Sequence, residues 1–215
     1  MGAMLRVTEI FHSIQGESTH AGRPCVFVRL TGCNLRCVWC DTAYAFHGGR
    51  PMSLDEVLEA VRAYGCPWVE LTGGEPLLQD EAYPLMQALI DAGYSVLVET
   101  GGSLPIDRVP RGVRRIVDVK CPASGEVERN RWENMADLRE GDELKFVLAG
   151  REDYEWAATQ VRERELDRRA PVLFSAVAEG LDAGDMARWV LDDGLPVRVQ
   201  LQMHKLLWPG VEKGI

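Results

Sequence analysis

Three cysteines stand close together in the sequence, Cys33, Cys37 and Cys40, in a C-x-x-x-C-x-x-C arrangement. Spacings this short place several sulfur atoms on one loop, which suits a metal centre better than disulfides between distant strands. A cubane iron–sulfur cluster has four irons and is usually held by four thiolates, so three cysteines would leave one iron open. An open metal position is typical of a site that carries out chemistry. A structural zinc site with His47 as a fourth ligand is the alternative that the spacing leaves open.

The elements that position these cysteines are predicted from hydrophobic patterning. Short runs rich in β-branched residues predict strands at 24–30, 68–72, 94–100, 114–120, 143–148, 172–177 and 197–201. Ser53 and Glu56 form a capping box that opens a helix. Apolar residues at helical spacing predict further helices at about 80–92, between 148 and 172, and near 186–191. The lead-in at 9–16 is not assigned to an element, and 125–139 is expected to be a loop or a short exposed helix.

Strands that alternate with helices indicate parallel β/α units, so we expect an α/β fold. About six strands at this length favour a partial (β/α) barrel, because a complete eightfold barrel typically takes ~250 residues. A single domain is expected over 4–215, with residues 1–3 a remnant of cloning. Ligands bind at the carboxyl ends of parallel strands. The polar and glycine-rich motifs follow the predicted strands at 33–42, 73–75, 99–102, 118–120 and 175.

Composition excludes several classes of function. The chain has 215 residues, 46% of them hydrophobic and 27% charged, which is ordinary for a globular protein. A net charge of −9 argues against a non-specific nucleic-acid binder, because no basic surplus is present to neutralise phosphates. No apolar run approaches the ~20 residues of a membrane span, so no membrane partner is expected. Six cysteines without a disulfide-like pattern favour a reducing compartment, and the cytoplasm is the expected location.

The chain resembles the radical S-adenosylmethionine enzymes, which share the cysteine spacing and a glycine-rich motif like Gly73-Gly74-Glu75. The narrower resemblance is to the 7-carboxy-7-deazaguanine synthase family. The residues that carry it are 13–18, 22–24, 27–35, 39–42, 72–79, 99–101 and 202–205. This resemblance implies conversion of 6-carboxy-5,6,7,8-tetrahydropterin to 7-carboxy-7-deazaguanine with loss of ammonia, in queuosine biosynthesis. It also implies a [4Fe–4S] cluster, S-adenosylmethionine, Mg²⁺, a flavodoxin-like or other reductase, and a homodimer.

The resemblance assigns roles to individual residues. It implies that the cluster is bound by Cys33, Cys37 and Cys40, and that Mg²⁺ is bound by Thr42. For S-adenosylmethionine it implies Trp39, Cys40, Asp41, Gly74, Asp118, Val119, Lys120 and Ser175. For the pterin it implies Ile14, Gln15, Gly16, Arg29 and Thr72.

Several of these roles have alternatives. Asp118 and Val119 depart from a Ser-Pro pair that is frequent in relatives, whereas Lys120 matches. Arg29 shares a strand face with Phe27, and either a substrate carboxylate or a salt bridge satisfies that pattern. Thr42 would otherwise be a turn residue. The closing residues at 204–205 would either close the pocket or form a solvated strand end. As whole functions, a glycyl-radical activase and a non-catalytic zinc or iron–sulfur module are the alternatives.

Overall fold

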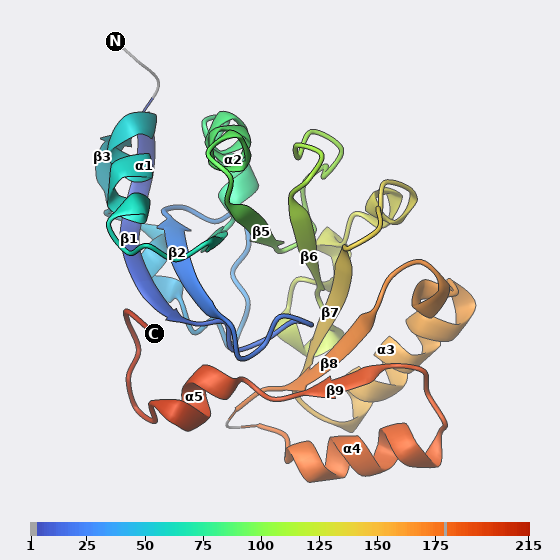
Figure 1. Ribbon diagram of the computed structural model, residues 1–215. Coiled ribbons are helices and arrows are strands. Elements are labelled where there is room, and N and C mark those ends of the chain that lie inside the picture. The colour runs from blue at the N-terminus through green and yellow to red at the C-terminus, as the bar shows by residue number, and fades with distance from the viewer. Residues whose placement is uncertain (1–3, 179) are drawn as a thin grey trace.

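The computed structural model describes residues 4–178 and 180–215. Their strands form one nine-stranded sheet in the order β3-β1-β2-β4-β5-β6-β7-β8-β9. Figure 1 shows that the sheet follows an arc from β1 and β3 past β5 and β6 to β9. The strands are β1 (Met4–Ile14), β2 (Pro24–Leu30), β3 (Arg50–Ser53), β4 (Trp68–Gly73), β5 (Ser95–Thr100), β6 (Arg114–Val119), β7 (Glu143–Leu148), β8 (Val172–Ala176) and β9 (Arg198–Gln200).

Most of the sheet is parallel. β1 pairs antiparallel with β2 and with β3, whereas every pairing from β2 through β9 is parallel. No pairing joins β9 to β3 among the described residues, so the sheet remains an open arc. The predicted α/β fold with a partial barrel is confirmed, with one parallel strand more than the six or so expected.

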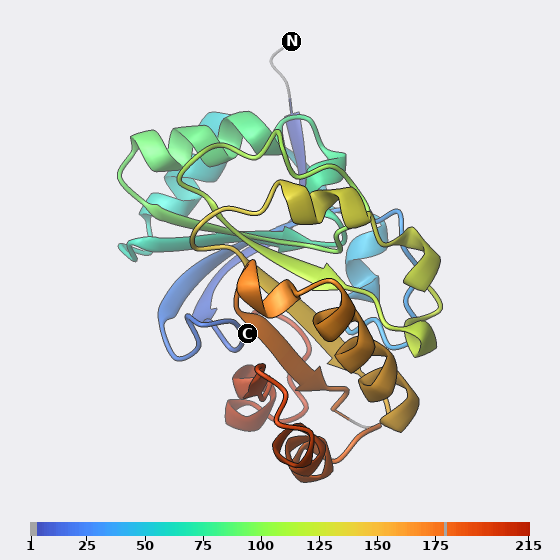
Figure 2. The ribbon, with the colours of Figure 1, turned by 90° about the vertical axis from the view of Figure 1, so that its right-hand side faces the viewer.

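The first four helices along the chain lie on the convex side of the sheet. Figure 2 shows α3 and α4 beside the C-terminal strands, and α1 and α2 lie beside the N-terminal strands in Figure 1. The capping box at Ser53 and Glu56 is present at the start of α1. The helices are α1 (Leu54–Arg62), α2 (Ala82–Asp91), α3 (Arg151–Glu163), α4 (Ala183–Asp192) and α5 (Met203–Leu207). Short 3₁₀ turns are η1 (Ala43–Phe46), η2 (Pro76–Leu78), η3 (Pro122–Ser124), η4 (Val127–Arg129), η5 (Trp132–Ala136) and η6 (Leu166–Arg168).

Strand alternation separates an apolar face from a polar one. In β7, for example, Leu144, Phe146 and Leu148 pack into the main core with the helices. Glu143 and Lys145 therefore face the concave side of the sheet, since successive side chains of a strand point to opposite faces. The concave face in this half of the molecule is polar and buried, and a buried polar surface is the usual setting of a ligand site.

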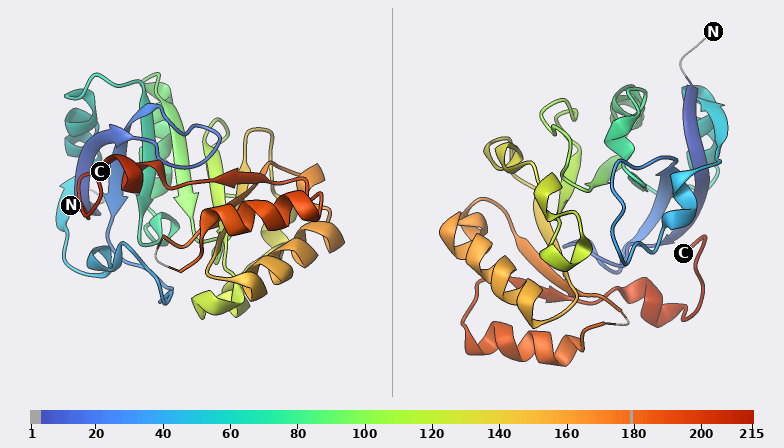
Figure 3. Two further views of the ribbon diagram at one scale, coloured as in Figure 1. Left: turned by 90° about the horizontal axis from the view of Figure 1, so that it is seen from below. Right: turned by 180° about the vertical axis from the view of Figure 1, so that it is seen from behind.

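Three elements differ from the sequence-based expectations. The lead-in continues into the long strand β1, and β3 pairs with its beginning; neither strand was predicted. The segment 125–139, by contrast, forms only the short 3₁₀ turns η4 and η5, in agreement with the expected loop or short helix. The short helix α5 replaces a plain tail, and Figures 1 and 3 show it between β9 and the β1–β2 hairpin. No helix within 4–178 and 180–215 is long and apolar enough to cross a membrane.

Candidate active site on the concave face

The three clustered cysteines lie on the loop that follows β2. Each is partly exposed, and none forms a disulfide. Cys40 N donates to Cys37 O at 3.2 Å, and Leu35 N donates to Cys33 Sγ at 3.4 Å, so the loop turns back on itself. Burial raises the pKa of the Cys33 and Cys37 thiols. The loop thus gathers three free thiols at the carboxyl end of β2.

The glycine pair after β4 packs directly under this loop. A Cβ on Gly74 would clash with the Gly32 carbonyl and come within 2.7 Å of Cys33 Cβ. Glu75 N donates to Gly32 O at 2.8 Å, which ties the two strand ends together. Glycine is required here because any side chain would push the cysteine loop away.

Glu75 connects the same turn to the end of β5. Its buried carboxylate accepts hydrogen bonds from Thr100 Oγ1 (2.8 Å), Gly101 N (2.8 Å) and Leu77 N (3.0 Å). Burial raises the pKa of Glu75, although these donors oppose the shift. Glu75 therefore fixes the relative positions of three neighbouring loops.

A polar chamber lies deeper on the concave face. We define the polar chamber as the side chains of Gln15, Glu17, Glu70, Glu99, Asp118 and Lys145. Gln15 Nε2 donates to Glu70 Oε2 at 2.7 Å, and both side chains are buried. Gln15 Oε1 accepts from Glu17 N at 2.5 Å, so the amide of Gln15 is held at both ends.

Lys145 lies at the centre of the polar chamber. Its Nζ donates to Glu17 Oε2 at 2.8 Å and to Glu99 Oε1, and it lies 4.0 Å from Asp118 Oδ2. Asp118 also pairs with Lys120 at 2.8 Å. Positive and negative groups therefore alternate along one row, which starts at Lys120 beside the cysteine loop and continues through Asp118 and Lys145 to Glu17.

Burial and pairing move the pKa values of these groups apart. Burial raises the pKa of Glu70 to about 8, helped by the nearby Glu99 carboxylate. Burial also opposes ionisation of Glu17, but attraction and hydrogen bonding from Lys145 lower its pKa to about 2. The pKa of Lys145 is well above its ordinary value despite burial, because carboxylates surround it. Strongly perturbed groups in a concave site are typical of functional sites.

Arg29 lies at the edge of the polar chamber, opposite Thr72 in the β2–β4 register. Its Nε donates to Glu9 Oε1 at 2.8 Å, and Tyr44 OH donates to the same oxygen at 2.7 Å. The salt-bridge alternative for Arg29 is therefore real. This salt bridge uses only the Nε of Arg29, so the two Nη atoms can still donate hydrogen bonds to a substrate carboxylate.

The loop at 14–17 is closed by the C-terminal segment. Met203 N donates to Gly16 O at 2.9 Å, and Gln202 Nε2 donates to Glu17 Oε1 at 2.8 Å. Gly16 lies against His204, whose pKa burial lowers. Ile14, the last residue of β1, is half-buried beside them. The alternative of a solvated strand end for His204 is wrong, because it lies in the helix α5 and is half-buried against Gly16.

α5 also reaches the cysteine loop. Lys205 Nζ pairs with Asp41 Oδ2 at 3.0 Å. Thr42 Oγ1 lies 3.7 Å from Cys40 Sγ and makes no capping hydrogen bond to η1, and Trp39 is half-buried beside them. One short helix therefore contacts both the loop at 14–17 and the cysteine loop.

The remaining predicted positions lie at the ends of β6 and β8. Ser175 Oγ is fully buried and has no hydrogen-bond partner among the residues that the structure describes. Lys120 N donates to Asn130 Oδ1 at 2.8 Å, which fixes the end of β6. Val119 points the other way into the main core, so only its backbone could contact a ligand on the concave face.

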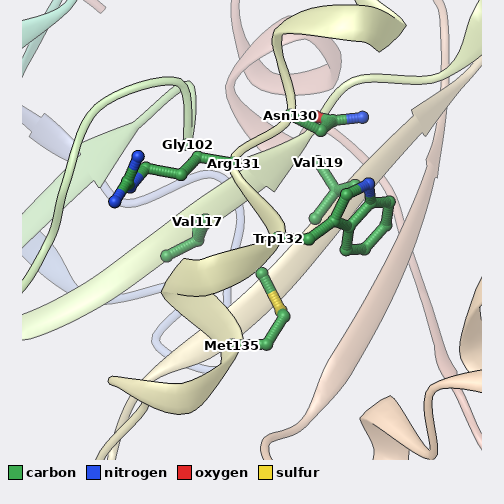
Figure 4. Close-up of a pocket in the computed structure, with 7 residues that line it drawn as sticks. All are labelled: Gly102, Val117, Val119, Asn130, Arg131, Trp132 and Met135. Carbon is green, nitrogen blue, oxygen red and sulfur yellow. The ribbon is translucent and has the colours of Figure 1, made fainter.

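The small cavity behind β6 is not part of this site. Its volume is about 10 Å³, room for little more than one water molecule. Figure 4 shows its lining residues, Gly102, Val117, Val119, Asn130, Arg131, Trp132 and Met135. Val117 and Val119 belong to the main core, so this cavity lies on the apolar side of the sheet.

Comparison with known proteins agrees with this geometry. The Radical SAM superfamily model matches residues 27–121. A 7-carboxy-7-deazaguanine synthase of Koribacter versatilis is 48% identical over 98% of this chain and 100% of that protein. One of Chlorobaculum tepidum is 45% identical over 99% of this chain and 98% of that protein. The chain belongs to the 7-carboxy-7-deazaguanine synthase family.

Solved structures share the fold. QueE from Escherichia coli has a TM-score of 0.76 at 22% identity, covering 94% of this chain and 95% of that one. SuiB from Streptococcus suis, bound to S-adenosylmethionine, has a TM-score of 0.60 at 13% identity, covering 80% of this chain and 48% of that one.

The residues present fit the cofactors of a radical S-adenosylmethionine family. Three free, partly exposed thiols lie on one loop. In an iron–sulfur cluster each cysteine binds a different iron atom, so the three sulfur atoms do not need to converge on one point. The buried Ser175 hydroxyl, which has no hydrogen-bond partner among the described residues, is suited to a bound polar molecule. Within 4–178 and 180–215, no three His, Cys, Asp or Glu side chains are grouped closely enough to hold a single metal ion.

Of the polar chamber's side chains, Gln15 and Asp118 were assigned roles from the sequence, but Glu17, Glu70, Glu99 and Lys145 were not. Glu17 lies within the motif at 13–18 and Glu99 lies at the end of a predicted strand, so the sequence marked both as candidate site residues. Lys145 also had a signal: in the predicted strand 143–148 it alternates with apolar residues, which places a charge on the inner face. What could not be read from the sequence is that these side chains meet.

Proposed function

We propose that this chain is a radical S-adenosylmethionine enzyme that converts 6-carboxy-5,6,7,8-tetrahydropterin to 7-carboxy-7-deazaguanine with loss of ammonia, in queuosine biosynthesis. The observation that carries the proposal is the juxtaposition of the three-cysteine loop and the polar chamber on one concave face. The relatives at 45–48% identity span the whole chain and bear that enzyme's name, which favours it over a glycyl-radical activase.

The cofactors would lie at the carboxyl ends of the strands. Cys33, Cys37 and Cys40 would hold the [4Fe–4S] cluster. When bound, the cluster and S-adenosylmethionine supply the adenosyl radical that starts the reaction. S-adenosylmethionine would contact the cysteine loop and the neighbouring strand ends through Trp39, Cys40, Asp41, Gly74, Asp118, the Val119 backbone, Lys120 and Ser175.

The chain's own residues would bind the pterin and shield it from water. The free Nη atoms of Arg29 would hold the substrate carboxylate, as a guanidinium fork favours. Gln15 and Thr72 would offer an amide and a hydroxyl to the ring, and the backbone at Ile14 and Gly16 would lie beside it. Because α5 packs over this loop, the bound ring would be enclosed and fixed in orientation.

We also propose that Thr42 gives Mg²⁺ one oxygen ligand, with other ligands coming from substrate and water. The support is a hydroxyl that is not used as a cap. Thr42→Ala should weaken the Mg²⁺ dependence of turnover and leave the iron content unchanged. An identical Mg²⁺ titration in the variant would remove Thr42 from the metal site.

The remaining proposals concern the protein's surroundings. We place it in the cytoplasm, where its six free cysteines stay reduced. We propose a homodimer formed by a single domain over 4–215, and a flavodoxin-like or other reductase as electron donor, with no nucleic-acid or membrane partner. Size-exclusion chromatography with light scattering tests the dimer.

The deciding experiment is anaerobic turnover after cluster reconstitution, with reductant, S-adenosylmethionine, Mg²⁺ and 6-carboxytetrahydropterin. We expect many products per S-adenosylmethionine, read from the deazaguanine absorbance. Cleavage of S-adenosylmethionine without that product would contradict the proposed substrate. An iron-loaded protein that cleaves no S-adenosylmethionine would contradict the proposed reaction class.

A further inference from the structure

Lys145 is a buried ammonium in the middle of the parallel sheet. Its side chain is 5% exposed, and it bonds Glu17 from the β1–β2 loop and Glu99 from β5. Asp118 from β6 lies 4.0 Å away. Lysine is almost never fully buried unless it is paired. Here one ammonium joins side chains from three separate elements.

Glu17 and Glu99 each have a second carboxylate oxygen that Lys145 does not contact, and only one of these two oxygens has another protein donor within the part of the chain that the structure describes. Glu17 Oε1 accepts from Gln202 Nε2 at 2.8 Å. Glu99 is 25% exposed, and among the described residues no protein donor reaches its second oxygen, Oε2. A carboxylate oxygen at a chamber wall, without a protein donor, is available to a ligand N–H.

The substrate of the proposed function has such N–H groups. The pyrimidine edge of a tetrahydropterin carries an amino group and a ring N–H side by side, and both are donors. An ionised carboxylate can accept hydrogen bonds at both of its oxygens, whereas protonation turns one of these oxygens into a donor. Two carboxylates at one site repel each other, and one of them takes up a proton unless a cation compensates.

We propose that Lys145 is a positioning residue for substrate binding, which holds Glu17 and Glu99 ionised and oriented as acceptors for the N–H groups of the pterin. The inference rests on the proposed function for the identity of the ligand. Lys145 itself acts through the two carboxylates and need not contact the substrate.

The electrostatics of the polar chamber support this role. Burial opposes ionisation of Glu17 and Glu99, and for both groups Lys145 is the largest influence in the opposite direction. The other ionisable groups that face this site are Asp118 and Lys120 of β6, Glu70 of β4 and His204 of α5. Removing the ammonium therefore raises the pKa of both carboxyls.

The test compares wild type with Lys145→Met in the cluster-loaded enzyme with S-adenosylmethionine. It measures KM for 6-carboxytetrahydropterin and, separately from turnover, Kd for the unreactive fluorescent probe 6-carboxypterin. We expect both constants to rise about 10- to 100-fold near neutral pH, because charge-assisted hydrogen bonds are lost. In the variant both constants should fall again as pH rises and the two carboxyls ionise, and this pH dependence should be steeper than in wild type.

Three further variants make the result specific. Lys145→Gln keeps a polar side chain with a hydrogen-bond donor but removes the charge, so it should show the same pH dependence as Lys145→Met even if Lys145→Met does not fold. Lys145→Arg keeps the charge and should show the pH dependence of wild type. Arg168→Met removes an exposed cation, 74% exposed, and should leave both constants unchanged. Iron content and thermal melting verify that each variant is folded.

The outcomes separate the two proposals. Folded Lys145→Met or Lys145→Gln that binds 6-carboxypterin like wild type, or that loses affinity equally at all pH values, would overturn the Lys145 inference alone. Wild type that neither converts the tetrahydropterin nor binds the probe would overturn the proposed function itself.

Discussion

Gly16 lies against the imidazole of His204 without room for a side chain: a Cβ on Gly16 would come within 3.0 Å of His204 Cγ and 2.9 Å of its backbone nitrogen. Met203 N donates to the Gly16 carbonyl from the same helix. The closure of α5 over the loop at 14–17 therefore depends on a residue with no side chain.

Gly16→Ala is expected to displace α5 and to destabilise the protein by about 1–3 kcal/mol through overpacking. KM for the pterin should rise about tenfold, while iron content stays the same, because the cysteine loop is not displaced by this clash. Steady-state kinetics and urea unfolding measure both effects. Gly150→Ala is the matched control, since nothing lies within 4 Å of its added Cβ. Unchanged KM in Gly16→Ala would show that the contact with α5 does not shape the site.

Arg29→Lys tests the shared use of one guanidinium. Arg29 bonds Glu9 through Nε at 2.8 Å, and a lysine has a single nitrogen that cannot serve Glu9 and a substrate carboxylate with the same geometry. We expect KM for the pterin to rise about 10- to 100-fold and the affinity for S-adenosylmethionine to stay constant. Arg108→Lys, at an exposed pair with Asp80, controls for the change of residue type. An equal loss of S-adenosylmethionine affinity would instead indicate a general structural defect.

Ser175→Ala should separate stability from ligand binding. The Ser175 hydroxyl is buried without a partner, and leaving a polar group unsatisfied costs about 1–3 kcal/mol. The ligand-free variant should therefore melt at the same temperature as wild type or higher. The stabilisation by added S-adenosylmethionine should shrink, with Kd about tenfold weaker. Ser13→Ala is the control, because it removes another buried hydroxyl without a partner among the described residues, near the end of β1. It should leave the Kd for S-adenosylmethionine unchanged. Equal affinity in both variants would refute the role of Ser175.

Glu70→Gln should change how stability depends on pH. The pKa of Glu70 is about 8 in the folded protein and close to 4.5 in the unfolded chain. Between these values the unfolded state releases the proton that the folded state keeps, so the contribution of Glu70 to stability falls as pH rises. Gln can still accept from Gln15 Nε2. The variant should gain stability relative to wild type by a few kcal/mol from about pH 5 to about pH 8.

Urea unfolding of the ligand-free protein at both pH values measures this difference. Glu163→Gln, an exposed carboxyl at the end of α3, should show no such trend. If the stability difference between Glu70→Gln and wild type were the same at both pH values, Glu70 would have to be ionised throughout.

The seven parallel strands could be predicted because most of them are short runs rich in apolar and β-branched residues. The positions of the cysteine loop and of Gly73-Gly74 followed from the same reasoning. β1 was missed because its alternation includes His12 and Ser13, whose polarity disguises a strand with one face toward the concave side. β3 was missed because four residues carry too little pattern to identify a strand.

The pairings within the polar chamber could not be predicted. Lys145 meets Glu17 and Glu99 only because the register of β5 to β7 and the path of the β1–β2 loop bring them together. Both are properties of the assembled sheet, and a shift of one residue in register would turn Lys145 to the other face. The closure by α5 is equally non-local, because it joins the two ends of the chain.

That closure has a consequence for the order in which the protein is assembled during synthesis. Glu17 and Gln202, which hydrogen-bond across it, are 185 positions apart in sequence. Contacts this distant form late, because closing so long a loop costs entropy that earlier contacts must first offset. The strands β2 through β8 can pair before α5 has been synthesised. The loop at 14–17 can reach its final position only after α5 has folded over it, so the proposed substrate site would be among the last features of the protein to mature.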